Sequence, residues 1–388
     1  MNARKISILG STGSIGRSTL DVVTAHPGKF DVVVLAAYSN TELLADQCRR
    51  FRPRYACLVD SSKINELRSR LGDLKVELLA GKEELVKLAG LDEIDLVVNA
   101  VVGAAGLLAS LEALKKGKPL ALANKESLVA GGPLFPEIIK KSGGKILPID
   151  SEHSALWQSL TAGKKDEVRR LIITASGGPF RHLAADKFDA ITPARALDHP
   201  TWKMGPKISI DSATLANKGL EVIEAVALFD MPVEKVSVVI HPESIVHSMV
   251  EYIDSSIIAQ LSSPDMRLPI TYAMFWPDRM PSEFGRLEIE QLSGLTFEPP
   301  DLQKFGALRL AFEVAKKGGT APAVFNAANE VAVESFLSNS IKFTEITDII
   351  DRAVETIDLV SRPELEDILE ADRWARELAH QIVESSTC

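Results

Sequence analysis

The stretch Ile6-Ser-Ile-Leu-Gly-Ser-Thr-Gly-Ser-Ile-Gly16 decides the fold of the first part of this chain. Its apolar start predicts a short strand, three glycines follow, and a helix-like pattern runs from Arg17 to Ala25. Glycines between a strand and a helix let the backbone approach a pyrophosphate, whose charge then lies at the helix N-terminus. The spacing is G-x-x-G-x-x-G rather than G-x-G-x-x-G, so a plain strand-to-helix turn is the alternative.

Strand-like and helix-like segments alternate in the residues that follow. Asp31 to Ala37 (DVVVLAA) has the pattern of a buried strand, and Thr41 to Phe51 has that of a helix. Continuous apolar strands that alternate with helices indicate a parallel sheet covered on both faces. We therefore predict an α/β chain whose residues 1–149 form an N-terminal, Rossmann-like, doubly wound domain. Further strands are predicted at 56–59, 95–101, 119–123 and 145–149, and a helix at 106–116.

The end of the second predicted strand favours one cofactor over another. An enzyme that uses NAD places an acid there to bind the ribose 2′-hydroxyl. This chain has Tyr38-Ser-Asn40 at that position and no acid before Glu42, which favours NADP. No arginine stands at the strand end either, so Ser39, Asn40 and backbone amides would have to bind the 2′-phosphate.

The pattern changes beyond Asp150, where glycine pairs, prolines and short strands predominate. This indicates a central α+β domain with long functional loops over residues 150–278, followed by a linker over 279–300. Residues 301–388 form a predicted C-terminal helical domain, in which Thr344 is a candidate N-cap. The short strands are predicted at 171–174, 208–210, 236–240 and 256–261, and the last two helices at 345–357 and around 365–382.

Composition excludes several classes of protein. The 388 residues carry 44 Lys and Arg against 53 Asp and Glu, a net charge of −9, which argues against a nucleic-acid partner. A hydrophobic content of 46% with 25% charged residues is typical of a folded globular protein. Cys48, Cys57 and Cys388 have no paired spacing, and no signal peptide or membrane span is evident, so we expect a cytoplasmic protein without a membrane partner.

Carboxylates near the end of the last predicted strand of the first domain suggest a metal site. If the strand continued through Asp150 and Glu152, both side chains would point to the same side of the sheet. Two carboxylates at the carboxyl edge of an open sheet suit a hard cation, although a pair of solvated surface acids is the alternative. Glu221, farther along the chain, supplies a possible third ligand.

Two later segments have the chemistry of an anion site. Ser212, Asn217 and Lys218 combine neutral hydrogen-bonding groups with one point charge, which suits a phosphate or a polyol. The alternative is a capped helix start with a surface lysine. Ser176-Gly-Gly178 could offer backbone amides and a hydroxyl to a phosphate, and its alternative is a plain glycine turn.

Two more segments are candidates for substrate contact. His199 to Gly205 combines a titratable side chain with Trp202 and Met204, which suits a lid that excludes water, although Trp202 could equally fill the core. Lys125 and its neighbours follow the predicted strand 119–123 and are placed for contact with substrate or ribose; a helix N-cap is the alternative.

Together these motifs resemble one family closely, the 1-deoxy-D-xylulose 5-phosphate reductoisomerases of the non-mevalonate isoprenoid pathway. The resemblance rests on GSTGSIG from Gly10, ANKESLV around Lys125, PIDSEHSA around Asp150 and SGGPF from Ser176. It continues through HPTWKMGPKISIDSATLANKGLEVIEA (199–225) and HPESIVHSMVE (241–251). It implies a dinucleotide-binding domain, a catalytic domain with a flexible flap near 199–206, a C-terminal helical domain and a homodimer.

The resemblance also implies roles for individual residues. Carried over by position, they are the metal ligands Asp150, Glu152 and Glu221 for Mg²⁺ or Mn²⁺ (Co²⁺ being a further option); the catalytic residues Lys125, Glu152 and His199; the substrate-binding residues Ser151, Ser176, Trp202, Met204, Ser212, Asn217 and Lys218; and the NADPH contacts Thr12, Gly13, Ser14, Ile15, Tyr38, Ser39, Asn40, Asn124, Glu126 and Gly205.

The implied reaction is an isomerisation followed by a reduction. The metal would act as a Lewis acid while the carbon skeleton of 1-deoxy-D-xylulose 5-phosphate rearranges, by retroaldol cleavage and realdol addition. NADPH would then reduce the branched aldehyde to 2-C-methyl-D-erythritol 4-phosphate. One alternative is a simpler NADP-linked dehydrogenase of the homoserine or semialdehyde type, although no cysteine is well placed as the nucleophile that the semialdehyde type needs. The other is a non-catalytic NADP sensor, which gives no reason for three carboxylates and a phosphate-binding cluster.

Overall fold

The computed structural model describes residues 3–198 and 204–386, and its chain divides into two compact units. The described residues within 1–127, 135–154 and 265–285 form the first unit, and those within 128–134, 155–264 and 286–388 form the second. The chain passes from one unit into the other within α6 (Lys125–Gly131) and within α8 (Ser151–Leu160). Neither unit is therefore a single continuous stretch of sequence.

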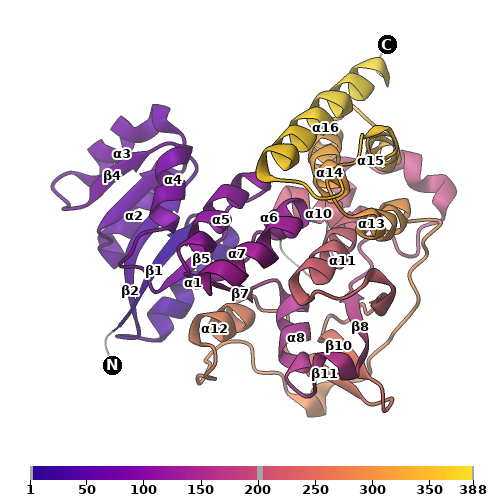
Figure 1. Ribbon diagram of the computed structural model, residues 1–388, viewed down its shortest axis with the longest axis horizontal. Coiled ribbons are helices and arrows are strands. Elements are labelled where there is room, and N and C mark those ends of the chain that lie inside the picture. Colours follow the sequence, from indigo (N-terminus) through magenta and orange to yellow (C-terminus); the bar gives the residue numbers. More distant parts are fainter. Residues whose placement is uncertain (1–2, 199–203, 387–388) are drawn as a thin grey trace. The chain divides into compact units, whose positions relative to one another are not determined.

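The first unit is built on a parallel sheet of seven strands in the order β4-β3-β2-β1-β5-β6-β7 (Figure 1). The apolar runs that predicted strands form its centre, because β1, β2 and β5 lie buried with helices on both faces. This confirms the predicted doubly wound, Rossmann-like architecture. The strands are β1 (Arg4–Leu9), β2 (Phe30–Ala37), β3 (Tyr55–Leu58), β4 (Glu77–Ala80), β5 (Leu96–Asn99), β6 (Pro119–Leu122) and β7 (Lys145–Pro148).

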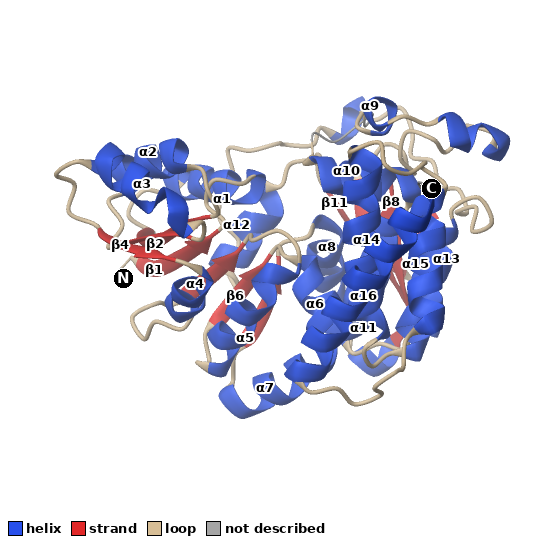
Figure 2. Ribbon diagram, turned by 90° about the horizontal axis from the view of Figure 1, so that it is seen from above, coloured by secondary structure: helices blue, strands red, loops and turns tan. Residues whose placement is uncertain are grey.

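Helices cover both faces of this sheet, as Figure 2 shows. Strand β4 and the helices beside it were not predicted, because β4 has only four residues and none of them is fully buried. One face carries α1 (Ser14–Ala25), α2 (Thr41–Phe51), α3 (Ile64–Leu71) and α12 (Arg267–Phe275), and the other carries α4 (Lys82–Ala89), α5 (Leu107–Lys115) and α7 (Phe135–Ser142).

Helix α12 joins the first unit from far along the chain. The Arg4 guanidinium donates a hydrogen bond of 2.7 Å to the carbonyl oxygen of Met274. The ring of Phe275 lies 4.8 Å from the rings of both Phe30 and His26. The domain division predicted from the sequence stays a prediction, and residues 265–278, which it assigned to the catalytic part, belong to the first unit.

The second unit combines a mixed four-stranded sheet with a layer of helices (Figure 2). The strand order is β11-β10-β8-β9, in which β8 is parallel to β9 and antiparallel to β10. The helices and one face of the sheet share a single apolar core. The strands are β8 (Val168–Ala175), β9 (Val236–Ile240), β10 (Val246–Tyr252) and β11 (Ile257–Leu261), and the helices are α9 (Pro193–Ala196), α10 (Pro206–Thr214), α11 (Ala216–Phe229), α13 (Gly306–Lys317), α14 (Ala321–Leu337), α15 (Glu345–Thr356) and α16 (Leu365–Ser386).

The helical character of the last part of the chain is confirmed, with two local differences from prediction. Residues 208–210, predicted as a strand, lie inside α10, which begins with Pro206 at its first position. Thr344 directly precedes α15, but its hydroxyl donates to the Asp189 carboxylate at 2.8 Å instead of capping the helix. None of the helices in the described ranges combines the length and apolar character that crossing a membrane requires.

Candidate functional site

The glycine turn after β1 is packed too closely for any larger residue at two positions. Gly10 has a φ of +84°, and a Cβ there would lie 2.4 Å from the carbonyl oxygen of Ala100, which follows β5. A Cβ at Gly16 would lie 2.3 Å from the carbonyl oxygen of Gly10. The turn therefore runs tightly against the end of β5 and leads directly into α1.

This turn lies where the strand order of the sheet reverses, since β1 pairs with β2 on one side and β5 on the other. Ligands of doubly wound sheets bind at such a point. Gly13 precedes the first residue of α1, and no side chain caps the backbone N–H groups of the first turn. Those N–H groups can therefore bind an anion. The structure brings together four predicted contacts here: Thr12, Gly13, Ser14 and Ile15.

The connection from β2 to α2 contains Tyr38, Ser39 and Asn40, and no acid that would bind a ribose 2′-hydroxyl precedes Glu42 there. Tyr38 is 69% exposed, and the N–H of Asp60 donates to its carbonyl oxygen at 2.8 Å. The side-chain oxygen of Asn40 accepts a hydrogen bond of 3.0 Å from the N–H of Leu43, so Asn40 is the N-cap of α2. Its side-chain nitrogen, the Ser39 hydroxyl and the backbone amides remain the groups suited to an anion.

The segment after β6 carries buried polar side chains. The Asn124 amide donates to the carbonyl oxygen of Gly103 at 2.8 Å and to the Glu126 carboxylate at 2.9 Å. The Asn124 oxygen accepts from the N–H of Ser127 at 3.1 Å, the hydrogen bond expected of a helix N-cap. The side chains of this segment lie in a polar part of the protein interior and are shielded from solvent, since Asn124, Lys125 and Glu126 are all buried.

Asp150 and Glu152 are brought together by a helix start and not by a strand. The strand predicted at 145–149 corresponds to β7, which ends at Pro148, and α8 begins at Ser151, so the strand period of two does not apply to Asp150 and Glu152. Asp150 precedes the helix and Glu152 lies in its first turn, where the helix dipole stabilises negative charge. The Ser151 hydroxyl donates to the Glu152 carboxylate at 2.5 Å.

Asp150 is paired with Lys125 of the neighbouring segment. The Lys125 Nζ lies 2.6 Å from the Asp150 carboxylate, and the two side chains are 11% and 10% exposed. Two predicted site residues from different strand ends thus meet in the first unit. Water is largely excluded from this ion pair, which strengthens the attraction between the charges.

In the second unit, Asn217, Lys218 and Glu221 share the first turns of α11. The Asn217 amide donates to one Glu221 oxygen at 2.5 Å, and the Lys218 ammonium contacts the other. The Lys218 side chain is 5% exposed and that of Glu221 is 1% exposed. The alternative of a surface lysine is therefore wrong, although Asn217 and Lys218 do lie at a helix start.

The Ser176 loop lies against the end of α10. Gly177 and Gly178 have positive φ angles, +84° and +66°, and the N–H of Gly178 donates to the Ser176 hydroxyl at 3.4 Å. A Cβ at Gly178 would lie 2.6 Å from the carbonyl oxygen of Ser212. This close approach to the Ser212 backbone explains why position 178 is a glycine. It also brings together two predicted phosphate-binding segments.

The flap is described only in part. His199 and Trp202 lie outside the described residues. Gly205 is the residue before α10, Pro206 is its first residue, and Met204 is half-buried.

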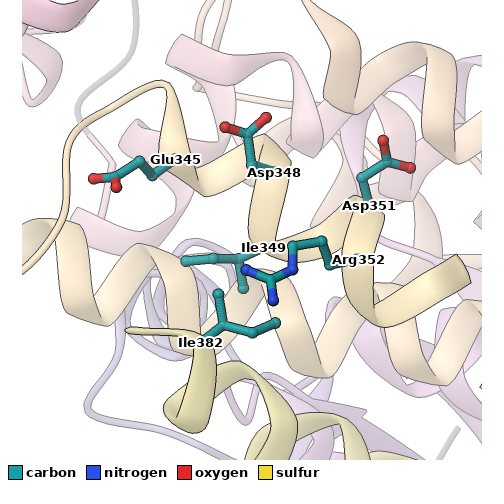
Figure 3. Close-up of a pocket in the computed structure, with 6 residues that line it drawn as sticks. All are labelled: Glu345, Asp348, Ile349, Asp351, Arg352 and Ile382. Carbon is teal, nitrogen blue, oxygen red and sulfur yellow. The ribbon is translucent and has the colours of Figure 1, made fainter. Parts of the chain in front are cut away.

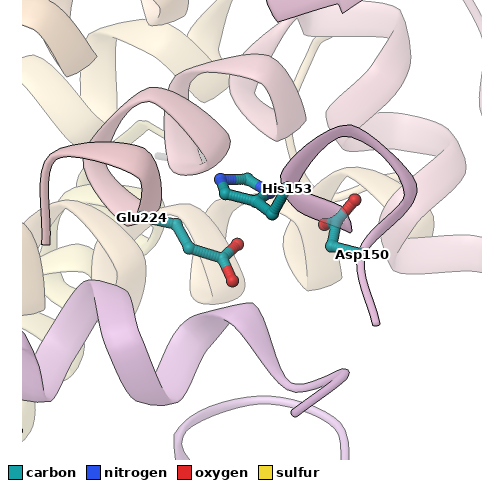
Figure 4. A group of neighbouring side chains, drawn as sticks. All are labelled: Asp150, His153 and Glu224. Carbon is teal, nitrogen blue, oxygen red and sulfur yellow. The ribbon is translucent and has the colours of Figure 1, made fainter. Parts of the chain in front are cut away.

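By donor chemistry, the candidate metal ligands are Asp150, Glu152 and His153 in the first unit and Glu221 and Glu224 in the second. Carboxylate oxygens suit a hard cation, so the donor type of Asp150, Glu152 and Glu221 favours Mg²⁺ over the imidazole of His153. Figure 4 labels Asp150, which precedes α8, His153 in the first turn of α8, and Glu224 of α11. His153 and Glu224 were not singled out from the sequence, although both are buried and each lies one helical turn or less from a predicted ligand.

A separate cavity of about 420 Å³ lies beside α15 and α16 (Figure 3). It is lined by Glu345, Asp348 and Asp351, with Arg352 beside them. Burial, followed by the nearby charges of Asp351, Glu345 and Asp189, raises the pKa of the Asp348 carboxyl. An acidic lining repels anions, so this cavity does not suit a phosphorylated substrate.

Comparison with known proteins identifies the family. The family model described as 1-deoxy-D-xylulose 5-phosphate reductoisomerase matches residues 6–132, and two models of C-terminal domains of the same enzyme match residues 146–229 and 261–378. The 1-deoxy-D-xylulose 5-phosphate reductoisomerase of Chlorobaculum tepidum is 51% identical over 380 residues, which are 98% of this chain and 100% of the relative. This chain belongs to the 1-deoxy-D-xylulose 5-phosphate reductoisomerase family.

Solved structures of reductoisomerases have the same fold. The enzyme from Zymomonas mobilis in complex with NADPH is 44% identical, with a TM-score of 0.93 over 99% of this chain and 100% of that chain. A reductoisomerase in complex with NADPH, fosmidomycin and magnesium is 39% identical, with a TM-score of 0.94 over 98% of both chains. The resemblance stated from the sequence motifs is thereby confirmed. Membership of this family also argues against the dehydrogenase and sensor alternatives.

Proposed function

We propose that this protein converts 1-deoxy-D-xylulose 5-phosphate to 2-C-methyl-D-erythritol 4-phosphate, with NADPH as reductant and a divalent metal ion, in the non-mevalonate isoprenoid pathway. The identity of 51% over 98% of the chain to a reductoisomerase carries this proposal. The residues of the candidate site support it, since they include carboxylates for a cation and polar groups for a phosphate.

The binding of NADPH is proposed at the glycine turn. The close packing of Gly10 and Gly16 leaves the backbone of residues 12–15 to approach a pyrophosphate, and the N-terminus of α1 stabilises its charge. When bound, NADPH supplies the hydride. The proposed contacts are Thr12, Gly13, Ser14, Ile15, Tyr38, Ser39, Asn40, Asn124, Glu126 and Gly205.

The binding of the metal is proposed at Asp150, Glu152 and Glu221, for which Mg²⁺, Mn²⁺ and Co²⁺ are the candidate ions. Each of these residues offers one carboxylate oxygen, the donor type that hard cations prefer. When bound, the ion supplies Lewis acidity to the substrate oxygens. Lys125 and Lys218 each form an ion pair with one of the carboxylates, Asp150 and Glu221 respectively, and so offset part of their negative charge.

The substrate is proposed to lie with its phosphate at the Ser176 loop and α11. The contact of Gly178 with the Ser212 carbonyl supports a joint role of these two segments. The proposed phosphate contacts are Ser176, Ser212, Asn217 and Lys218; the rest of the substrate would be held by Lys125, Ser151, Glu152 and His199, under a flap that contains Trp202 and Met204.

We further propose a homodimer in the cytoplasm. The edge strand β11 supports the dimer, because Ile257 and Ile258 are 51% and 39% exposed and Ile253 before it is 66% exposed. Exposed apolar side chains on an edge strand are usually covered. Light scattering on the purified protein tests this: a mass twice that of the chain is expected, and a monomer at micromolar concentration would contradict it.

The activity is tested by following NADPH oxidation in the presence of 1-deoxy-D-xylulose 5-phosphate and Mg²⁺, with the product identified by NMR. Oxidation is expected to require both the substrate and the ion, and a chelator is expected to stop it. Turnover that persists with chelator would contradict the metal assignment. Absence of methylerythritol phosphate among the products would contradict the proposed function itself.

A further inference from the structure

A cavity of about 650 Å³ in the second unit includes Ser176, which directly follows β8 and is proposed to contact the substrate phosphate. Arg181 and Arg195 line the same cavity, and Asp198 is the carboxylate among the described lining residues. The cavity therefore carries a surplus of positive charge in a chain whose net charge is −9.

Neither arginine is paired with an acid among the residues that the structure describes. Among residues 3–198 and 204–386, no carboxylate oxygen lies within 4.0 Å of a guanidinium nitrogen of Arg181 or Arg195. Lys218, the cation of the proposed phosphate contacts, is by contrast paired with Glu221. A phosphate monoester carries between one and two negative charges at neutral pH, so Lys218 alone does not balance it.

Arg181 is held beside the Ser176 loop by local contacts. Its Nε donates to His182 Nε2 at 2.9 Å, and its Nη1 lies 3.4 Å from the Ser176 carbonyl oxygen, to which it donates. Its Cδ would lie 3.2 Å from a Cβ placed on Gly177, so the side chain covers the loop. Lys304 donates to the Arg181 carbonyl oxygen at 2.6 Å and adds a third cation to this segment.

Arg195 approaches the same segment from α9. Its guanidinium carbon lies 5.7 Å from the centre of the Phe180 ring, the residue next to Arg181. A guanidinium has a planar set of donors that matches a phosphate, and its charge does not depend on pH in the physiological range. Two guanidinium groups that line one cavity, and that have no acidic partner in the described part of the chain, form an anion-binding arrangement.

We infer that Arg181 and Arg195 form an electropositive pocket that draws the phosphate group of the substrate to Ser176. The inference rests on the proposed function, because it takes Ser176 as a phosphate contact. The two arginines supply attraction for the dianion over distances longer than a hydrogen bond, and Ser176, Ser212 and Asn217 then fix its position. The pocket compensates locally for the acidity of the whole chain.

The test replaces the charges singly and together, as R181Q, R195Q and the double variant, and measures kcat and kcat/KM at low and at high salt. The double variant is expected to lose about tenfold in kcat/KM at low salt and to keep its kcat, with a smaller loss at high salt where ions screen the attraction. R181K retains the charge and is expected to keep the salt dependence of the parent. R309Q is the matched control, since Arg309 pairs with Glu313 on the exposed face of α13.

Calorimetry with inorganic phosphate gives a readout that does not require turnover. The double variant is expected to bind phosphate several-fold more weakly than the parent and R309Q, with unchanged NADPH binding. If the double variant has the parent's salt dependence of kcat/KM and the parent's affinity for phosphate, the inferred role of the two arginines is wrong. A loss of kcat as large as the loss of kcat/KM would contradict it as well. If the parent fails to convert the pentulose phosphate but binds phosphate through the arginines, the proposed function fails and the anion pocket stands.

Discussion

The Lys125 ammonium lies 2.6 Å from the Asp150 carboxylate, and both side chains are almost completely shielded from solvent. One residue follows β6 and the other follows β7, so the pair joins neighbouring strand ends at one edge of the sheet. A cation bound by Asp150 would have to share this carboxylate with the Lys125 ammonium. Substitution of Asp150 therefore tests whether this pair takes part in the reaction.

The substitution Asp150→Asn is expected to lower turnover by about 100-fold or more while leaving the affinity for NADPH nearly unchanged. The amide keeps the shape of the side chain but loses the charge that a divalent cation requires. Steady-state kinetics and NADPH fluorescence titration measure the two effects. Asp230→Asn, at an exposed residue paired with Lys165, is the control, and an equal loss of turnover and NADPH affinity in D150N would indicate misfolding instead.

The substitution Lys218→Met is expected to destabilise the metal-free protein by about 3 kcal/mol, because Glu221 would remain buried without its cation. Mg²⁺ is expected to restore part of this loss if Glu221 is a ligand. Thermal unfolding with chelator and with Mg²⁺ measures both.

Arg373→Met supplies the comparison for this variant, since Arg373 and Glu370 form a pair with the same spacing on an exposed face of α16. Its loss should change stability by less than about 1 kcal/mol. A raised melting temperature of K218M with chelator, or a Mg²⁺ response no larger than that of R373M, would argue against a charge-balancing role for Lys218.

The substitution Gly16→Ala is expected to weaken NADPH binding by about tenfold or more, because its methyl group would lie 2.3 Å from the Gly10 carbonyl oxygen and force the turn to move. Fluorescence titration with NADPH measures the change. Gly294→Ala is the control, because no atom lies within 4 Å of a Cβ at that position. If G16A binds NADPH as tightly as G294A does, the glycine turn is not the pyrophosphate site.

The substitution Asp348→Asn is expected to stabilise the second unit at neutral pH by roughly 0.5 kcal/mol, a small value because solvent screens this partly exposed group. Burial and neighbouring carboxylates raise its pKa above the ordinary 3.8, so the folded protein binds this proton more readily than the unfolded chain does. The parent therefore loses stability as pH rises through the raised pKa. The advantage of D348N should disappear below pH 3.8, and an advantage that grows on acidification would contradict the assignment.

Much of the first unit could be predicted from the sequence because its strands are continuous apolar runs between helices. The error at 208–210 arose from an Ile-Ser-Ile alternation too short to distinguish a strand from a helix, while Pro206 was a helix-start signal. The same period of two was applied to Asp150 and Glu152, although a helix start also brings such residues together. Both residues remain candidate metal ligands, because that prediction rests on their carboxylate groups and applies to a helix start as well as to a strand.

Other features depend on tertiary contacts that no local pattern contains. The burial of Lys218 and the pairing of Lys125 with Asp150 join residues whose spacing carries no signal of contact. Arg181 was passed over because a single arginine after a glycine turn has no distinctive pattern. Only the fold shows that it lies in one cavity with Ser176 and Arg195.

Helix α12 belongs to the first unit but is synthesised long after its strands, which affects folding during translation. The first strand of the sheet is anchored through Arg4 to Met274, and Phe30 packs on Phe275, so these contacts cannot form until the ribosome has released a segment more than 100 residues beyond β7. At ordinary translation speeds that delay is of the order of ten seconds. During this delay the side of α1 that packs against α12 stays uncovered.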